Sequence, residues 1–433
     1  MIDTRDVVHA PPGPLSLAAR GVSLPAAAAF RRPMSAPRSV PRVLGLGLLL
    51  CDLLACAPTI RTPLKQALPS VTGDSSTATG PCLGEPARID LGGPAVGGAL
   101  ADLDGDGVKD LALAALGPGG GAAVFFRHDG QGGLEPSMRV PIPQTPTAIV
   151  AGDFNNDGLD DLVIGAADPP ALHVLLARGR GEFIAGATPL RVAPEALWVA
   201  RVDGDESLDL LALDAGGKAV RTLLGDGHGE WKEGKRSALP ARVQPAALTL
   251  VDADRDQILD LAVLGDSRSD AVVTLVRGDG RGEFGKTLQR RVVGRGARAL
   301  LGAPLAGDDG HDLLALVDAA GPGAGSPVAA VLVHNGPLEY AAVGYFVPGP
   351  LGDATLSDLD RDGDLDLVSA AADGSAVHVV PGDGRGGFAQ AQSRRATGLG
   401  AAVLVLDGNR PTVLAFGPGS QQLHVFPVTR CGG

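Results

Sequence analysis

The stretch ADLDGDGVKDLAL (residues 101–113) decides the fold, because variants of it return along the chain about every 50 residues. The clear copies are GDFNNDGLDDLVI (152–164), RVDGDESLDLLAL (201–213), VDADRDQILDLAV (251–263) and SDLDRDGDLDLVS (357–369). Two divergent copies bring the number of units to seven: APLAGDDGHDLLAL (303–316) and LVLDGNRPTVLAF (404–416). In the seventh unit, Val413 replaces the last acidic residue. Internal repeats of this length are typical of solenoids and propellers.

Each acidic stretch is followed by a short apolar strand, a second strand and a glycine-rich turn such as LARGRGEF (176–183) or RGDGRGEF (277–284). Short strands with regular turns and no helical periodicity indicate an all-β repeat. Four strands in about 50 residues match one blade of a β-propeller. We therefore predict an all-β, seven-bladed β-propeller of four-stranded blades over residues 81–433.

The seventh unit ends after its third strand, QLHVFPVT (422–429), so one strand is missing from its blade. The segment ARIDL (87–91) precedes the first unit and has no blade of its own. We expect it to supply the outer strand of blade 7 and close the ring, which removes an exposed sheet edge. The closure would bring Cys82 beside Cys431, and an exported protein can keep such a disulfide.

The acidic loops carry the ligand pattern of a calcium site. In loop 1 (102–110), aspartates stand at positions 1, 3, 5 and 9 and Gly107 stands at position 6, where a sharp bend is needed. Ca²⁺ takes six to eight oxygen ligands, including backbone carbonyls such as that of position 7. The predicted ligands are Asp102, Asp104, Asp106, Val108 and Asp110 in loop 1; Asp153, Asn155, Asp157, Leu159 and Asp161 in loop 2; Asp252, Asp254, Asp256, Ile258 and Asp260 in loop 4; and Asp358, Asp360, Asp362, Asp364 and Asp366 in loop 6.

About four Ca²⁺ ions are thus expected, and the other three loops are not expected to bind metal. Loop 3 (201–209) begins with Arg201, whose guanidinium can neutralise the remaining acids, and loops 5 and 7 have lost too many ligands. An EF-hand needs a bidentate glutamate at position 12, where these copies carry Leu113, Ile164, Val263 or Ser369. Dockerin-like loops fail at the same position. The alternative reading is a set of solvated acidic turns without metal.

These DxDxDG loops, followed by segments such as DLVIGA (161–166), resemble the FG-GAP or VCBS repeats of integrin α-subunit heads and of many exported bacterial proteins. The resemblance covers about residues 93–416. It implies a seven-bladed propeller with Ca²⁺ in loops on one face. The FG and GAP segments themselves are mostly absent, so the repeat type is better supported than closeness to integrins.

The N-terminal region is expected to be an export address. Arg38 and Arg42 precede an apolar run of signal-peptide length that ends in Leu53-Leu54-Ala55-Cys56, which resembles the lipobox of bacterial lipoproteins. Cys56 would then carry the lipid, although Asp52 inside the run departs from the pattern. Residues 34–55 are read as the signal peptide, with Met34 as the true start and 1–33 as a mis-annotated extension. Residues 56–80, rich in Pro, Ser, Thr and Gly, are read as a flexible tether.

Some apparent motifs are explained by the repeat. GRGEFGKT (280–287) matches a phosphate-binding loop, and Arg277-Gly278-Asp279 spells a cell-attachment tripeptide, but both fill the hairpin slot of the fourth unit. His173, His378 and His424 occupy one column in different units, so they are not expected to converge as ligands or catalysts. The chain contains neither GxSxG nor HExxH.

Composition narrows the function. The net charge of −12 disfavours nucleic acid, and 14 aromatic residues leave little material for stacking on sugars, with Trp198 and Trp231 as the candidates. We expect a monomeric, lipid-anchored, calcium-stabilised binding or adhesion module of the bacterial cell envelope, on the outer membrane or cell surface, without catalysis. Its ligand would be a protein or a glycan, and only the lipid would touch the membrane. The alternatives are a propeller hydrolase or lyase acting on polysaccharide or phosphoester, and a purely structural envelope component.

Overall fold

The computed structural model describes residues 80–117, 120–241, 243–306, 311–318, 327–347, 351–417 and 420–431. Three two-residue strands lie outside these ranges, and they pair with outer strands of the fold: β1 (Val7–Val8), β2 (Thr59–Ile60) and β3 (Lys65–Gln66). Apart from these three short strands and Gly80, the predicted extension, signal peptide, lipidated Cys56 and tether lie outside the described residues. No helix of the described part is long and apolar enough to cross a membrane.

The described chain is all β, and its first three blades lie in separate antiparallel sheets, each built on four consecutive strands, with β1 added at the edge of blade 2. Blade 1 holds β6 (Ala95–Ala101), β7 (Asp110–Gly117), β8 (Gly120–His128) and β9 (Leu134–Ile142). Blade 2 holds β10 (Thr145–Gly152), β11 (Asp161–Ala167), β12 (Ala171–Ala177) and β13 (Phe183–Pro189). Blade 3 holds β14 (Pro194–Ala200), β15 (Asp209–Asp214), β16 (Ala219–Gly225) and β17 (Trp231–Ala238).

Blades 4 and 5 share one long strand, β21 (Phe284–Ala303). Its first half is the outer strand of blade 4, beside β18 (Gln244–Val251), β19 (Asp260–Ser267) and β20 (Asp270–Gly278). Its second half is the inner strand of blade 5, beside β22 (Asp312–Asp318), β23 (Pro327–Gly336) and β24 (Glu339–Phe346). Blade 6 holds β25 (Leu351–Ser357), β26 (Asp366–Ala371), β27 (Ala376–Val380) and β28 (Gln392–Arg395).

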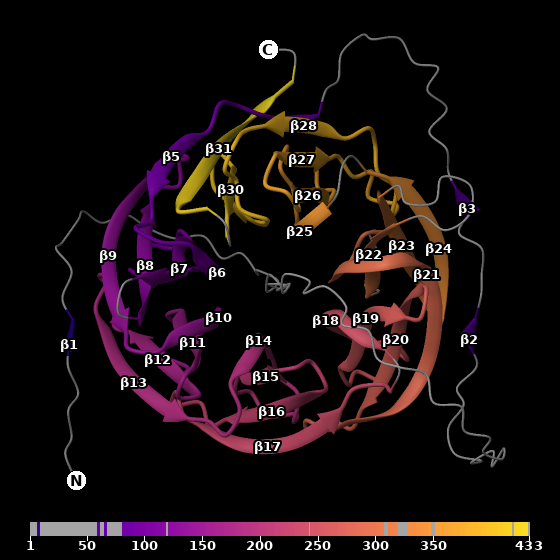
Figure 1. The fold of residues 1–433 in the computed structure, drawn as a ribbon, viewed down its shortest axis with the longest axis horizontal. Coiled ribbons are helices and arrows are strands. Elements are labelled where there is room, and N and C mark those ends of the chain that lie inside the picture. Colours follow the sequence, from indigo (N-terminus) through magenta and orange to yellow (C-terminus); the bar gives the residue numbers. More distant parts are fainter. Residues whose placement is uncertain are drawn as a thin grey trace, which may run out of the picture.

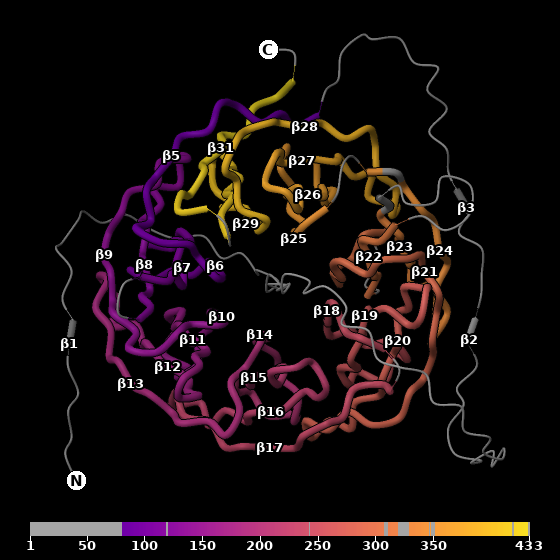
Figure 2. The backbone as a smooth tube through the Cα atoms, viewed as in Figure 1, coloured from indigo at the N-terminus to yellow at the C-terminus, as the bar shows by residue number. Residues whose placement is uncertain are grey.

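Blade 7 confirms the predicted closure of the ring. It holds β29 (Ala402–Leu406), β30 (Thr412–Phe416) and β31 (Gln422–Arg430), and its outer strand is β5 (Ala87–Asp90) from the other end of the fold. Strand β4 (Pro81–Leu83) pairs with the far end of β31. A disulfide joins Cys82 to Cys431, with the two Cα atoms 5.2 Å apart. Figure 2 shows the indigo N-terminal strands running beside the yellow C-terminal ones at this point.

The seven blades form a closed ring around a common axis (Figure 1), with β6, β10, β14, β18 and β25 innermost and β9, β13, β17 and β28 on the rim. Seven buried apolar clusters fill the seven contacts between neighbouring blades, so the core is a set of layers between blades. This is the stacking expected of repeats that each contact only their neighbours.

The contact between blades 7 and 1 is packed like the others. Leu113 of blade 1 meets Leu404 and Phe416 of blade 7 in one buried cluster. A Cβ atom added at Gly98 of β6 would lie only 2.7 Å from Phe416 Cζ and 2.8 Å from Leu113 Cδ2. Glycine at this position therefore allows the closing blades to approach closely. Each fully buried Leu or Phe contributes about 1.5–3 kcal/mol to stability.

Candidate metal centres

Each acidic loop connects the innermost strand of a blade to the second strand, so the seven loops recur at equivalent places around the ring. The residue at position 9 is the first residue of the second strand in six blades, where it is Asp110, Asp161, Asp209, Asp260, Asp312 or Asp366. In blade 7 that place is held by Thr412, opposite Leu406. The sequence-based assignment of Val413 to it was wrong by one residue, because the seventh loop is three residues shorter than the others.

Hydrogen bonds fold each intact loop around the carboxylate at position 1. The N–H groups of Gly107, Gly158, Gln257 and Gly363, all at position 6, donate to the position-1 aspartates of loops 1, 2, 4 and 6. Gln257, which replaces glycine in loop 4, reaches this geometry with a left-handed φ of 67°. The replacement of glycine by glutamine therefore leaves the bend intact.

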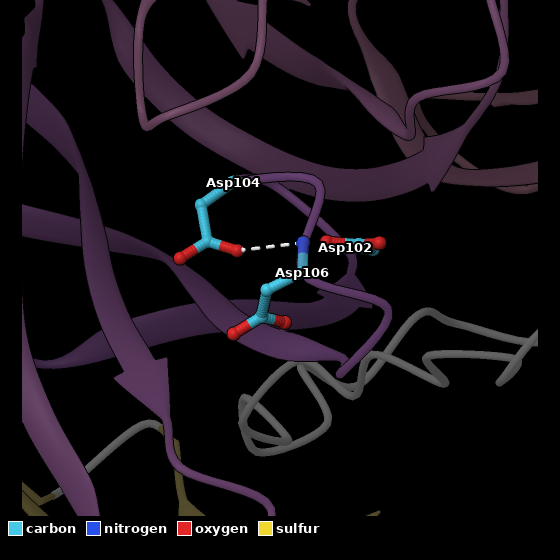
Figure 3. Close-up of side chains that lie close together, drawn as sticks. All are labelled: Asp102, Asp104 and Asp106. Atoms are coloured by element: carbon cyan, nitrogen blue, oxygen red, sulfur yellow. Dashed lines mark hydrogen bonds between the residues drawn. The ribbon is translucent and has the colours of Figure 1, made fainter. Parts of the chain in front are cut away.

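Three loops bring carboxylates together closely enough to hold a metal ion. The groups are Asp102, Asp104 and Asp106 in loop 1; Asp252, Asp254 and Asp260 in loop 4; and Asp358, Asp360 and Asp366 in loop 6, with ligand atoms within 4.8 Å of one another in each group. Figure 3 shows the loop 1 side chains around one turn of the chain, with the N–H of Asp106 donating to Asp104. Three of the four loops predicted to bind Ca²⁺ thus have the required crowding of oxygens.

Loop 2 is the fourth predicted site, and its acids do not form such a group in the described chain. Asn155 stands at position 3, where the other three loops have aspartate, and its amide donates to Asp157. A neutral ligand reduces both the charge and the number of carboxylate oxygens. At position 7, the N–H groups of Val108, Leu159, Ile258 and Asp364 donate to the position-5 carboxylates, and the ligand role of their carbonyls stays a prediction.

The position-3 carboxylates are best suited to binding a cation. Asp254 Oδ1 and Asp360 Oδ1 are buried and have no hydrogen-bond partner among the described residues. Burial, followed by the charge of the neighbouring position-5 aspartate, raises the pKa values of Asp104, Asp254 and Asp360. Buried oxygens without a donor are rare in folded proteins, and an oxygen-binding cation would satisfy them.

The position-9 aspartates have a second role that the sequence-based assignment missed. Both carboxylate oxygens of Asp161 accept backbone hydrogen bonds, from Phe154 in its own loop and from Ala177 at the end of the third strand. The same pair of bonds holds Asp209 in loop 3, which lacks the metal ligand pattern. The position-9 carboxylate therefore ties the loop to the blade whether or not a metal site is present. Its persistence in loops 3 and 5 was the sequence signal for this role.

Burial raises the pKa of these position-9 carboxyls despite their hydrogen bonds. The pKa is raised to about 7 for Asp110 and Asp161 and to about 6 for Asp260 and Asp366. Desolvation is the largest cause, and nearby loop carboxylates raise the values further. A divalent cation in the loop would oppose this shift by favouring the ionised form.

Two arginines, also missed from sequence, lie against the carboxylates of loops 1 and 4. Arg127 Nε is 3.2 Å from Asp104 Oδ2, and Arg277 Nη2 is 2.7 Å from Asp256 Oδ2 and 3.4 Å from Asp254 Oδ2. Both arginines occupy the penultimate residue of the third strand of their blade. The recurrence of Arg at the same place before two glycine-rich turns was the available signal.

The glycine-rich turn of one blade docks on the acidic loop of the preceding blade. Gly229 donates its N–H to the carbonyl of Phe154, and Gly282 donates to that of Val202. Leu338 and Gly386 make the corresponding bonds to Ala253 and Leu305. Folding of an acidic loop is therefore coupled to the contact between two blades.

The motifs attributed to the repeat are placed as expected. Residues 280–287 lie in the hairpin between β20 and β21, with a strand starting at Phe284 where a phosphate-binding loop needs a helix. Arg277 is paired with loop 4, and Asp279 accepts the N–H groups of Arg281 and Glu283 within its own turn. Both charged side chains of the Arg-Gly-Asp tripeptide thus make contacts within their own blade.

The three histidines lie in separate blades, and the two tryptophans pack between blades. His173, His378 and His424 lie at the same register of the third strands of blades 2, 6 and 7. Trp198 and Trp231 pack into apolar clusters between blades, with buried indole nitrogens. Trp231 also contacts Phe154 edge to face at 5.3 Å. The two tryptophans suggested for sugar stacking are thus partly buried against the core.

Comparison with known proteins agrees with the repeat assignment. Residues 88–164 and 201–263 match the model of the FG-GAP-like repeat, which is the repeat type that the acidic loops resemble. No curated protein matches the chain. Among solved structures, a chain from the crystal structure of BBS1N in complex with ARL6DN, soaked with lead, is similar with a TM-score of 0.52 and 13% identity, covering 81% of this chain and 98% of that one.

A second solved structure concerns specific recognition of non-reducing terminal N-acetylglucosamine by an Agrocybe aegerita lectin. It is similar with a TM-score of 0.46 and 17% identity, covering 71% of this chain and 80% of that one. At such low sequence identity, structural similarity shows the fold and does not identify a ligand.

Proposed function

We propose that the chain is an exported, lipid-anchored, calcium-stabilised propeller that acts as a non-catalytic binding or adhesion module at the bacterial cell envelope. The observation that carries the proposal is the recurrence of aspartate groups in loops 1, 4 and 6, each built on a rigid hairpin of the ring. Carboxylate oxygens are the ligands that Ca²⁺ prefers, and extracellular fluid supplies this ion at concentrations that suit weak sites.

Bound calcium would stabilise the acidic loops and the contacts between neighbouring blades. When bound, the ion supplies positive charge that neutralises crowded carboxylates, and the loop it orders is the one on which the next blade docks. The backbone donors at position 6 orient the first carboxylate, while the position-9 aspartate anchors the loop to the blade. A closed ring held in this way presents its remaining loops in fixed positions, as binding modules require.

The inner strands offer few charged side chains that could serve catalysis. In their described residues they carry four charged side chains: Glu195, Arg295, Arg298 and Asp353. Arg298 is held by Asp318, with Nη2 3.0 Å from Oδ1, and Glu195 accepts the N–H of Gly216. A hydrolase or lyase needs an acid, a base and a cation free to meet a substrate. The proposed partner is a protein in preference to a glycan, because both tryptophans pack between blades with their indole nitrogens buried.

The anchor and the binding role are tested separately. Full-length protein expressed in a bacterium should fractionate with membranes, and Cys56→Ser should release it or retain the uncleaved signal. The purified chain, immobilised on beads, should bind a glycan panel or an extracellular protein saturably in Ca²⁺ and lose that binding in EDTA. Membrane association unchanged by Cys56→Ser would contradict the lipid anchor. Turnover of a polysaccharide or phosphoester would contradict the non-catalytic assignment.

A further inference from the structure

Loops 1 and 4 differ from loop 6 in having a cation of their own. The guanidinium groups of Arg127 and Arg277 each contact the carboxylates at positions 3 and 5 of the adjacent loop. These are two of the carboxylates that a metal ion would use. The corresponding residue of blade 6 is Pro381, which carries no charge. Arg430 of β31 acts on Asp360 through its charge, but loop 6 forms no ion pair within the described ranges.

The charge balance of the loops follows from this difference. In loop 4, Arg277 Nη2 lies 2.7 Å from Asp256 Oδ2 and 3.4 Å from Asp254 Oδ2, so it contacts one of the three aspartates grouped for a metal, Asp252, Asp254 and Asp260. A guanidinium in this position compensates the repulsion between carboxylates in the absence of metal. It also repels an incoming divalent ion and holds oxygens that the ion needs.

We propose that Arg127 and Arg277 are built-in competitor cations that occupy loops 1 and 4 until Ca²⁺ displaces them, so that loop 6 fills at lower Ca²⁺ concentration than loops 1 and 4. Side-chain exposures of 43% for Arg127 and 47% for Arg277 leave room for each guanidinium to swing into solvent. The inference rests on the calcium binding proposed above and adds an order of filling to it.

The order of filling gives the module a graded response. Loop 6 would keep its fold at low Ca²⁺, while loops 1 and 4 would exchange an internal ion pair for a metal ion as the concentration rises. The contacts affected lie where neighbouring blades meet: Arg180 donates to the carbonyl of Asp104 in loop 1, and Leu338 donates to that of Ala253 in loop 4. Two of the seven blade contacts would then respond to external Ca²⁺.

The test is a calorimetric Ca²⁺ titration of the full-length chain and its variants. Arg277→Gln should tighten one site by about tenfold or more, because a positive charge near the ion is removed. Adding Asp252→Asn should abolish that gain, and Arg127→Gln should act in the same way through loop 1. The matched control is Arg281→Gln, which removes an exposed arginine of the same turn that forms no ion pair in the described chain.

Each outcome decides the matter. Unchanged affinities in both arginine variants, with Ca²⁺ still bound, would overturn the competitor role and leave the calcium proposal standing. Absence of Ca²⁺ binding in the natural chain and in every variant would overturn both. Binding at loops 1 and 4 only after the arginines are removed would support the competitor role in its strongest form. Asp358→Asn should remove a tighter phase than the one the arginines control, and loss of a weaker phase would contradict the order.

Discussion

Cys82 and Cys431 are separated by 349 residues in sequence and joined by a disulfide at the point where the ring closes. The bond lies beside the antiparallel pairing of β4 and β5 with β31, so it locks both ends of the described fold onto blade 7. Ring closure therefore has three independent supports: backbone pairing, apolar packing against blade 1, and a covalent bond.

The first prediction concerns this bond. Replacing both cysteines by serine should lower the free energy of unfolding by about 5 kcal/mol, because the disulfide restricts a very long loop of the unfolded chain. Chemical denaturation of the oxidised protein measures the change. The natural chain in reductant should match the double variant. Identical denaturation midpoints with and without the bond would contradict the prediction.

The second prediction separates anchoring from metal binding at position 9. Asp209→Asn should destabilise the fold by about 1–3 kcal/mol. The two carboxylate oxygens of Asp209 accept hydrogen bonds from two backbone N–H groups, and the NH₂ of asparagine would face one of those N–H groups donor to donor. The loss should be equal in Ca²⁺ and in EDTA, since loop 3 lacks the ligand pattern. The comparison is Asp358→Asn, whose loss should be larger in Ca²⁺. A calcium-dependent loss for Asp209→Asn would show that loop 3 also binds metal.

The third prediction uses the pKa values of the position-9 carboxyls. Their pKa in the folded protein is about 6 to 7, above the ordinary value of 3.8. Without metal, the folded state therefore binds more protons than the unfolded chain between about pH 4 and 7, and these groups favour folding as the pH falls through that range. Ca²⁺ must displace those protons. The rise in Tm caused by Ca²⁺ should accordingly be larger at about pH 8 than at about pH 5.5.

Comparing Tm with and without Ca²⁺ at each pH removes contributions that do not depend on metal. Buried histidines such as His378, whose pKa is lowered by desolvation, destabilise the fold as the pH falls whether or not Ca²⁺ is present. They cancel in the difference. An equal calcium effect at both pH values would show that these carboxyls are not coupled to the metal sites.

The fourth prediction concerns the closing contact. Gly98→Ala should cost about 1–3 kcal/mol, because the new Cβ would lie within 2.9 Å of Leu113, Leu404 and Phe416 side-chain atoms. Gly186→Ala is the matched control, since a Cβ at that strand position meets nothing within 4 Å. Thermal unfolding of both variants checks the difference. Equal stability of the two would mean that the blade 7 and blade 1 contact is loosely packed.

The blade count, the closing strand and the neighbourhood of the two cysteines were predictable from sequence because repeats define one another. The aligned acidic stretches set the register of seven units. The seventh unit lacks an outer strand after residue 429, and ARIDL is the strand-like segment without a blade, so it was expected to fill that position. Composition played little part in these predictions. The error at Val413 arose where the seventh loop is shortened, since alignment by spacing fails where spacing changes.

The candidate metal sites were less predictable. The spacing of aspartates in the sequence does not show which carboxylate oxygens already accept hydrogen bonds from the backbone. Asp161 and Asp260 were both predicted to be metal ligands from their position in the loop. Each of them, however, accepts hydrogen bonds from backbone N–H groups of two separate segments. Arg277 read as part of a turn, and only the hairpin geometry places its guanidinium on loop 4. Contacts between strand ends distant in sequence decide both cases.

The most direct test of the account is metal binding and thermal unfolding measured together on the full-length chain. Protein prepared without metal should bind about three to four Ca²⁺ and gain a large increase in Tm. Each site filled at a hundredfold excess over its dissociation constant adds about 2.7 kcal/mol. EDTA should reverse the gain. No bound Ca²⁺ and identical Tm values in Ca²⁺ and EDTA would mean that the acidic loops are solvated turns, which would contradict the calcium-stabilised propeller.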